Sequence, residues 1–370
     1  MINNLLKTSL ESKTLISRKI DNCLGSIDAL DVDEHWNNHS FGGVDFNHSL
    51  LAVDGSFNQV SLVVGNVCTL SSLALYSGNS TMSSVCDINH IVFLPSTTVD
   101  YNSILSKQMG VLELKSILNS LYSMSDVDYL LLDGDIHSIL NHIARGVNTV
   151  MRNEQSIVDL TNEIVGENID SYSADVPSID DIISDTSHIN NFSKSELVMY
   201  YLMIEELSIL YNILKDYSDK IICISKTSRT HYLYDRGVSD LALIDNYCKF
   251  SGFSDEQRVV DNRFRFHRFN EIFYGRYPVY DSFFRELTFT NRFVKLSDRA
   301  SVLKVQLVGD VSRSDFIRVL DVLSDASLTS TGYPVLLKKV HDDVKITGRD
   351  MDNIMRNLRL DYYKNERDML

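Results

Sequence analysis

The chain contains Leu50-Leu51-Ala52-Val53-Asp54-Gly55-Ser56 and, further along, Tyr129-Leu130-Leu131-Leu132-Asp133-Gly134-Asp135. Each stretch is a short apolar run, typical of a buried β-strand, that ends at an Asp followed by a Gly where the backbone can turn. An aspartate at this point lies at the edge of a sheet and not in its core. Two such carboxylates on neighbouring strands can share divalent metal ions, which suits phosphodiester chemistry. The alternative interpretation is an ordinary turn after each strand.

The segments around these two strands predict an α/β fold. Further strands are predicted at 60–64, within 67–76, and at 90–94, 221–224 and 302–308. Helices are predicted at 103–122, 136–157, 194–216 and 313–323, with a last helix beginning at Pro334. This order, β-β-β-α-β-α-β-α, is that of the ribonuclease H-like fold, a mixed sheet flanked by helices, here with helical and loop insertions. In that order the two Asp-bearing strands can lie side by side.

We expect three regions along the chain. Residues 1–45 form an N-terminal helical segment, residues 46–350 the ribonuclease H-like domain, and residues 351–370 a C-terminal helix or tail. Between 154 and 206 there are twelve acidic residues and one lysine, which predicts an acidic insertion at about 160–190 with a surface loop over 163–185. A second insertion, rich in Arg and aromatic residues, is expected at about 255–300.

Composition excludes several classes of protein. The 370 residues, 44% of them hydrophobic, are enough for a large core. There is no uninterrupted apolar run of about 18 residues and no apolar segment of signal-peptide type near the N-terminus, so we expect no membrane span. The five cysteines are scattered without Cys-x-x-Cys spacing, which argues against structural zinc and disulfides and favours a reducing cytoplasm.

The net charge of −15 argues superficially against a nucleic-acid partner, but its distribution is uneven. Between 251 and 300 there are nine basic and seven acidic residues, interleaved with aromatic side chains such as Phe284 and Phe293. Arginines suit phosphates and aromatic rings suit unstacked bases, so this segment is a candidate DNA contact. The alternative is an amphipathic strand with solvated Arg and core Phe. The candidate DNA-binding residues are Arg263, Arg265, Arg268, Arg276 and Arg292.

Three further residues could complete a site around Asp54 and Asp133. Glu113 lies in a mostly apolar helical stretch between the two Asp-bearing strands, and one helical turn could face the site. Lys226 follows a third buried strand and could hold a phosphate as a point charge. His341 lies about two turns into the last helix, and a neutral imidazole can bind manganese or shuttle a proton. Each also has a structural interpretation: a helix-surface Glu, a solvated Lys and a structural His.

In this order and spacing, the motifs resemble those of the NurA nucleases of archaea and some bacteria. The resemblance runs from about 50 to 345 and rests on Asp54-Gly55-Ser56, helical Glu113, Asp133-Gly134, Ser225-Lys226, and Tyr333-Pro334 followed by His341. It places the family's acidic metal ligands at Asp54, Glu113 and Asp133, its strand-end lysine at Lys226, and its functional C-terminal Tyr and His at Tyr333 and His341. The chain departs from the family at Val340, where a small residue is usual, and in its acidic insertion.

The resemblance implies a function as well as a fold. It implies manganese-dependent DNA cleavage, with magnesium as the alternative ion and Asp54, Glu113, Asp133 and His341 around a two-metal site. It implies 5′ to 3′ exonuclease activity, endonuclease activity on single strands, and substrates that include single- and double-stranded DNA ends. It also implies a homodimer that docks on a hexameric ATPase of the HerA type in end resection for recombinational repair.

Two other functions fit parts of the pattern. An actin-like or sugar-kinase-like ATPase also uses Asp-Gly strand ends, but it would show an internal duplication and a second phosphate loop. The chain has neither of these and no G-x-x-x-x-G-K-[ST] motif, so it lacks the motifs of a nucleotide-driven motor. A catalytically silent scaffold of nuclease ancestry would not need the three carboxylates and His341 together.

Overall fold

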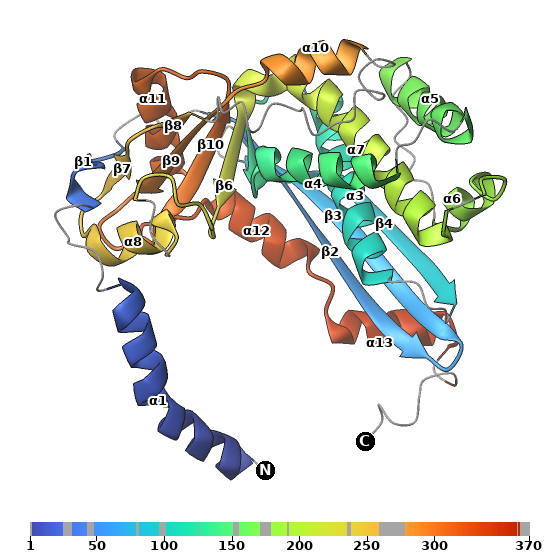
Figure 1. Cartoon of the computed structure of the whole chain (residues 1–370), viewed down its shortest axis with the longest axis horizontal. Helices are drawn as coiled ribbons and strands as arrows, with labels where there is room; N and C mark the ends of the chain where they lie inside the picture. Colours follow the sequence, from blue (N-terminus) through green and yellow to red (C-terminus); the bar gives the residue numbers. More distant parts are fainter. Residues whose placement is uncertain are drawn as a thin grey trace.

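The computed structural model describes residues 2–24, 32–42, 48–78, 81–95, 101–124, 126–150, 155–170, 179–190, 192–234, 238–258, 278–360 and 362. Within them, one mixed sheet has the strand order β1-β7-β9-β10-β6-β5-β2-β3-β4, and β8 pairs with β9 (Figure 1). The strands span Trp36–Asn38 (β1), Leu50–Leu62 (β2), Gly65–Gly78 (β3), Thr81–Pro95 (β4), Tyr129–Asp133 (β5), Ile221–Ser225 (β6), Gly252–Ser254 (β7), Gln257–Arg258 (β8), Phe289–Lys295 (β9) and Leu303–Val308 (β10).

Helices cover both faces of this sheet (Figure 1). They span Ile2–Leu24 (α1), Tyr101–Ser123 (α3), Ile136–Val150 (α4), Gln155–Asp170 (α5), Ile179–Asp185 (α6), Lys194–Tyr217 (α7), Asp240–Tyr247 (α8), Pro278–Glu286 (α10), Arg313–Asp325 (α11), Val335–Val344 (α12) and Gly348–Asn357 (α13). One core cluster joins α3, α4 and α7 to one face, and a second joins α11 and α12 to the other. The predicted α/β fold with a mixed sheet flanked by helices is confirmed, while its ribonuclease H-like ancestry stays a prediction.

The centre of the sheet is parallel. β2 pairs with β5 and β5 with β6 in parallel, whereas β2 pairs with β3 and β6 with β10 antiparallel. The carboxyl ends of parallel strands meet at one edge of a sheet, and this edge is where β5 and β6 end. The Asp-bearing strands β2 and β5 are direct neighbours there, as the element order predicts.

Alternation along these strands decides which face each side chain occupies. Leu51 and Val53 pack into the α3/α4/α7 cluster, whereas Leu50 and Ala52 pack into the α11/α12 cluster. Leu131 on β5 and Ile224 on β6 also belong to the α11/α12 cluster. The period of two therefore directs the next residues in these rows toward α12.

Several predicted boundaries are wrong. β2 runs unbroken over thirteen residues, so the strand does not end at Asp54 and 60–64 is no separate strand. The predicted helix 136–157 ends at Val150. The loop predicted over 163–185 is helical at 163–170 and 179–185, because Ile164, Ile179 and Ile182 pack into the core against α7. The many acidic residues between these apolar positions lower the average hydrophobicity of the segment, so the sequence suggested a loop. Residues 259–277, which form the middle of the expected Arg/aromatic insertion, lie outside the described residues.

The helix α7 is the most apolar helix of the core. Together with the 3-10 turn Ser218–Lys220 that follows it, this helix is long and apolar enough to cross a membrane by length and composition, but 83% of its most apolar window is buried inside the protein. Its N-terminus is fixed by a capping box between Ser193 and Glu196, a pattern readable from the sequence. α7 thus acts as the central core helix against which α3, α4 and α5 pack.

Candidate active site

Asp54 and Asp133 lie side by side where the parallel strands end. Val53 and Leu132 are the last paired residues of β2 and β5, so the two aspartates follow in register. Both continue rows of side chains that face α12, and Lys226 continues the corresponding row of β6. Three side chains that the sequence predicts for the site therefore share one face of one sheet edge.

Groups from α12, from the turn before it and from the end of β6 contact these aspartates. His341 Nδ1 lies 2.7 Å from Asp54 Oδ2, and Lys226 Nζ lies 2.9 Å from Asp133 Oδ2. The same ammonium lies 4.2 Å from the ring centroid of Tyr333, a cation–π contact. Burial raises the pKa of the Tyr333 phenol, and the neighbouring charge of Asp133 and a hydrogen bond donated to that carboxylate raise it further. Tyr333 thus stays protonated and serves as a donor.

The end of α12 is tied to the strand that carries Asp54. The backbone N–H of Ile346 donates to Ser56 Oγ at 3.1 Å, and Asn58 Nδ2 donates to the Ile346 carbonyl at 3.1 Å. Ile346 lies in the short connection between α12 and α13, so these bonds hold the C-terminal end of α12 to β2. The position of His341 relative to Asp54 follows from that attachment.

Glu113 reaches the same edge from the opposite face of the sheet. β5 ends at Asp133 while β2 continues to Leu62, so the edge of β2 beyond Asp54 has no β5 partner. Gly55 faces α3 at this point, and a Cβ built on it would lie 2.5 Å from Glu113 Oε1. The missing side chain of Gly55 lets the carboxylate of Glu113 approach the strand backbone.

The electrostatics of Glu113 connect it to both aspartates. Burial raises the pKa of this carboxyl group to about 8, and the negative charges of Asp54, Glu206 and Asp133 contribute in that order. A hydrogen bond from the backbone N–H of Gly55 opposes the rise. Carboxylates that repel one another in this way are a donor set that a bound cation would stabilise.

The Gly55→Ala substitution should disturb the geometry of the candidate site without much effect on the stability of the fold. The new methyl group would meet Glu113 Oε1 and Met109 Cε, each at 2.5 Å, so these two flexible side chains must move. We expect an activity loss of about tenfold or more, since misplacing a reacting group is costly, with a small change in melting temperature. Gly166→Ala on α5 is the control, because a Cβ there meets nothing within 4 Å. Unchanged activity in Gly55→Ala would show that Glu113 needs no contact with β2.

The residues fit a divalent cation in kind. Three carboxylates and one imidazole are ligands that manganese accepts, and magnesium also takes carboxylates. Among the described residues, no three His, Cys, Asp or Glu side chains stand close enough together to hold one ion as they are placed. Asp54 is engaged with His341, and Asp133 with Lys226. Asp54, Glu113, Asp133 and His341 thus lie at one edge of the sheet, where Asp54 is paired with His341 and Asp133 with Lys226.

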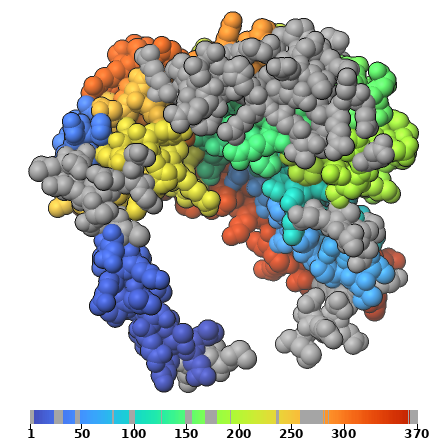
Figure 2. Space-filling model, viewed as in Figure 1, coloured from blue at the N-terminus to red at the C-terminus, as the bar shows by residue number. Residues whose placement is uncertain are grey.

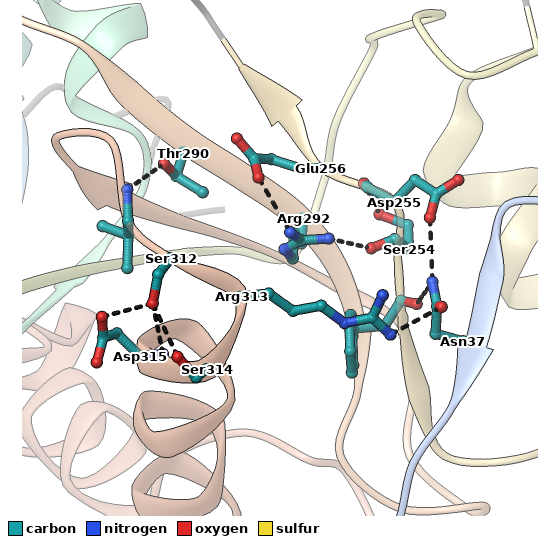
Figure 3. A network of polar contacts seen from close by, with 12 residues as sticks. Asn37, Ser254, Asp255, Glu256, Thr290, Arg292, Ser312, Arg313, Ser314 and Asp315 are labelled. Carbon is teal, nitrogen blue, oxygen red and sulfur yellow. Dashed lines mark hydrogen bonds and ion pairs between the residues drawn. The ribbon is translucent and has the colours of Figure 1, made fainter.

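The predicted DNA-binding arginines are not part of this cluster. Arg263, Arg265, Arg268 and Arg276 lie outside the described residues. Figure 3 shows Arg292, whose guanidinium donates to the Ser254 carbonyl at 2.9 Å and to Glu256 at 3.2 Å. Its side chain is only 5% exposed, so it stabilises the β7–β9 region and is not free to hold a phosphate. The aromatic residues Phe284 and Phe293 are also buried, which supports their core interpretation.

Sequence reasoning missed a buried ion pair behind Glu113. Lys107 on α3 and Glu206 on α7 are 2.6 Å apart, with side chains 10% and 5% exposed. The signal was present: Glu205 and Glu206 interrupt the apolar run of α7, where a charged residue needs a partner. Glu205 has such a partner in Lys115, also at 2.6 Å.

Comparisons with known proteins converge on one family. The NurA domain family matches residues 48–346. A protein of Methanocaldococcus jannaschii named "Probable DNA double-strand break repair nuclease NurA" is 23% identical over 366 residues, covering 96% of this chain and 90% of that protein. The "DNA double-strand break repair nuclease NurA" of Sulfolobus acidocaldarius is 25% identical over 333 residues, covering 89% and 86%.

Solved structures share the fold. The crystal structure of the NurA nuclease from Sulfolobus solfataricus superposes with a TM-score of 0.71 at 20% identity, covering 97% of this chain and 96% of that one. A crystal structure of NurA bound to dAMP and manganese gives a TM-score of 0.69 at 15% identity, covering 95% and 97%. At these identities the likeness shows the fold alone.

Proposed function

Because the chain belongs to the NurA family, we propose that it is a metal-dependent deoxyribonuclease that acts in the repair of DNA double-strand breaks. The observation that carries the proposal is the placement of Asp54 and Asp133 directly after the last paired residues of two adjacent parallel strands, with Glu113 at the same edge. Relatives in other organisms are named double-strand break repair nucleases, and one NurA structure holds manganese.

In this proposal, Asp54, Glu113, Asp133 and His341 hold manganese, or alternatively magnesium, in a two-metal site. When bound, such ions stabilise the attacking and leaving oxygens of a phosphodiester. Lys226 holds a phosphate oxygen of the strand, for which a flexible ammonium is suited. Tyr333 supports Lys226 through its ring and donates its hydroxyl proton in a hydrogen bond to Asp133.

The direct test is cleavage of end-labelled DNA by the full chain. We expect cleavage of single- and double-stranded oligonucleotides in manganese, weaker cleavage in magnesium, and none in excess chelator, because the carboxylates alone provide no electrophile. Restoring manganese after chelation should restore cleavage. ATP hydrolysis without DNA cleavage would instead support the kinase-like alternative, and inactivity in every metal would support a silent scaffold.

The finer features of the family belong to the same proposal. They are 5′ to 3′ exonuclease activity on single- and double-stranded ends, endonuclease activity on single strands, a homodimer, and a hexameric HerA-type ATPase that moves the DNA. Arg263, Arg265, Arg268 and Arg276 are the proposed DNA contacts, and Arg292 is withdrawn from that set. We also propose, from its place in the NurA family, that the protein acts in the cytoplasm.

The helix α1 supports the dimer part of the proposal. It extends away from the body (Figure 2), and its large apolar residues are 53% to 71% exposed, among them Leu6 and Leu10. We propose that this stripe packs against a second copy. We expect Leu6→Asp together with Leu10→Asp to shift a dimer to a monomer in sedimentation at micromolar concentration, while Lys7→Glu, an exposed polar control on α1, leaves it dimeric. A wild-type monomer would contradict the dimer without touching the nuclease proposal.

A further inference from the structure

A cavity of about 690 Å³ opens between α3, α4 and α7, on the α3 side of the sheet. Ser106 on α3 contributes to its wall, and Gly110 and Glu113 follow at the spacing that places residues on one helix face. Seven residues of helix rise about 10 Å, so the cavity lies within that distance of the candidate active site along α3. Ser138, in the first turn of α4, brings the wall back toward Asp133.

The floor of the cavity is set by a buried ion pair and two methionines. Lys107 and Glu206 lie 2.6 Å apart and are almost fully buried. A Cβ on Gly110 would lie 3.1 Å from Glu206 Oε1, so the glycine lets this carboxylate lie against α3. Met199 and Met203, with Ile139, supply the apolar part of the lining. Thioethers make favourable contacts with aromatic rings.

The rim is polar but carries little charge. Asn102, Ser106 and Ser138 offer amide and hydroxyl groups that both donate and accept hydrogen bonds. Burial lowers the pKa of His142, and the charges of Lys107 and Arg145 lower it further, so its imidazole is neutral at pH 7. Because Glu206 neutralises Lys107, a free phosphate gains little here.

A flat, uncharged group with hydrogen-bonding edges matches this lining. Its faces would pack on the thioethers and its edges would meet the hydroxyls, the amide and the imidazole. A volume of about 690 Å³ falls in the usual range of ligand sites, about 300–1,000 Å³. These are the properties of a nucleobase.

We propose that this cavity, the base pocket, holds one unstacked nucleobase of the DNA strand whose phosphate is cleaved at Asp54, Glu113 and Asp133. The inference rests on the proposed function. The distance of about 10 Å along α3 corresponds to roughly three stacked nucleotides, and to fewer where the strand is extended. Base recognition at a fixed distance from the cut would set the position of cleavage in a single strand.

The test uses oligonucleotides with one abasic position, moved stepwise along the strand, and the full chain in manganese. For wild type we expect one position at which the missing base lowers kcat/KM by about tenfold, the scale of one base-stacking contact. Ser106→Trp fills the pocket from an exposed position. It should lose about tenfold on the intact strand and become insensitive to that abasic position. Ser138→Trp, on α4, should behave alike, while Ser123→Trp, on α3 outside the pocket, should match wild type.

Binding without catalysis separates this inference from the proposed function. Anisotropy of a labelled oligonucleotide in chelator should show weaker binding by Ser106→Trp than by Ser123→Trp, whether or not the protein cleaves DNA. Normal cleavage with a flat abasic profile, or equal effects in all three Trp variants, would overturn the base pocket and leave the nuclease intact. A third outcome is that dAMP competes with DNA for wild type but not for Ser106→Trp, while cleavage depends on no abasic position. This result would overturn the proposal of a strand-bound base and identify the released mononucleotide as the occupant.

Discussion

Asp54→Asn and Asp133→Asn should each lower DNA cleavage in manganese by on the order of a thousandfold while the protein stays folded. Each change removes one negative charge at the sheet edge and keeps the size of the side chain. A metal contributes several kcal/mol to such a reaction, and about 1.4 kcal/mol corresponds to a factor of ten. The apolar core loses little, because both carboxylates lie at the edge of the sheet and are partly exposed, Asp54 by 18% and Asp133 by 33%.

The double variant sharpens this prediction. If both carboxylates serve one site, the double variant Asp54→Asn with Asp133→Asn should cleave DNA as fast as the less active of the two single variants. The reason is that the rate losses of residues in one catalytic unit do not add. Asp219→Asn is the matched control: it is exposed and lies just before β6, at the opposite end of the parallel strands. Near wild-type cleavage by either single variant, with thermal melting unchanged, would eliminate that aspartate as a metal ligand.

Glu113→Gln should cost about a hundredfold in cleavage and change how stability depends on pH. In the metal-free protein the pKa of Glu113 is about 8, against an ordinary value of 4.5. Between these values the folded state keeps a proton that the unfolded state has released. The stability that this group contributes is therefore complete below about pH 4.5 and is lost as the pH rises toward 8.

Melting curves in chelator test that sign. Glu113→Gln removes the ionisation, so it should melt like wild type at pH 5 and about 2 °C higher at pH 8.5. Adding manganese at pH 8.5 should raise the melting temperature of wild type more than that of Glu113→Gln, because the ion binds the ionised carboxylate. Glu163→Gln, an exposed change on α5, should show neither effect. A variant destabilised equally at both pH values would mean that Glu113 is a structural residue.

Local pattern predicted the parts of the site that belong to the strands. The apolar runs before Asp54 and Asp133 identify both strands, and the element order makes them neighbours, as the register of β2 and β5 confirms. Alternation with a period of two is a property of the backbone itself, so it also predicts that these aspartates share a face. The spacing from Pro334 placed His341 correctly on its helix.

The same local patterns failed where burial is decided by distant segments. Nothing near Arg292 in the sequence shows that Ser254 and Glu256 will enclose its guanidinium. The acidic residues of 163–185 suggested a loop, but the apolar residues among them pack on α7, a separate element that follows in the chain. Such outcomes depend on non-local packing energy, which can exceed local propensity.

The sequence alone thus determined the α/β order, the two aspartates on neighbouring strands and the helices that carry Glu113 and His341. Only the tertiary structure decided how these groups meet. β5 ends while β2 continues, which opens the edge where Glu113 reaches Gly55, and the tie between Ile346 and β2 sets His341 against Asp54. Strand and helix periods are local properties of the chain, whereas the meeting of groups from β2, α3, β5 and α12 depends on how whole elements pack.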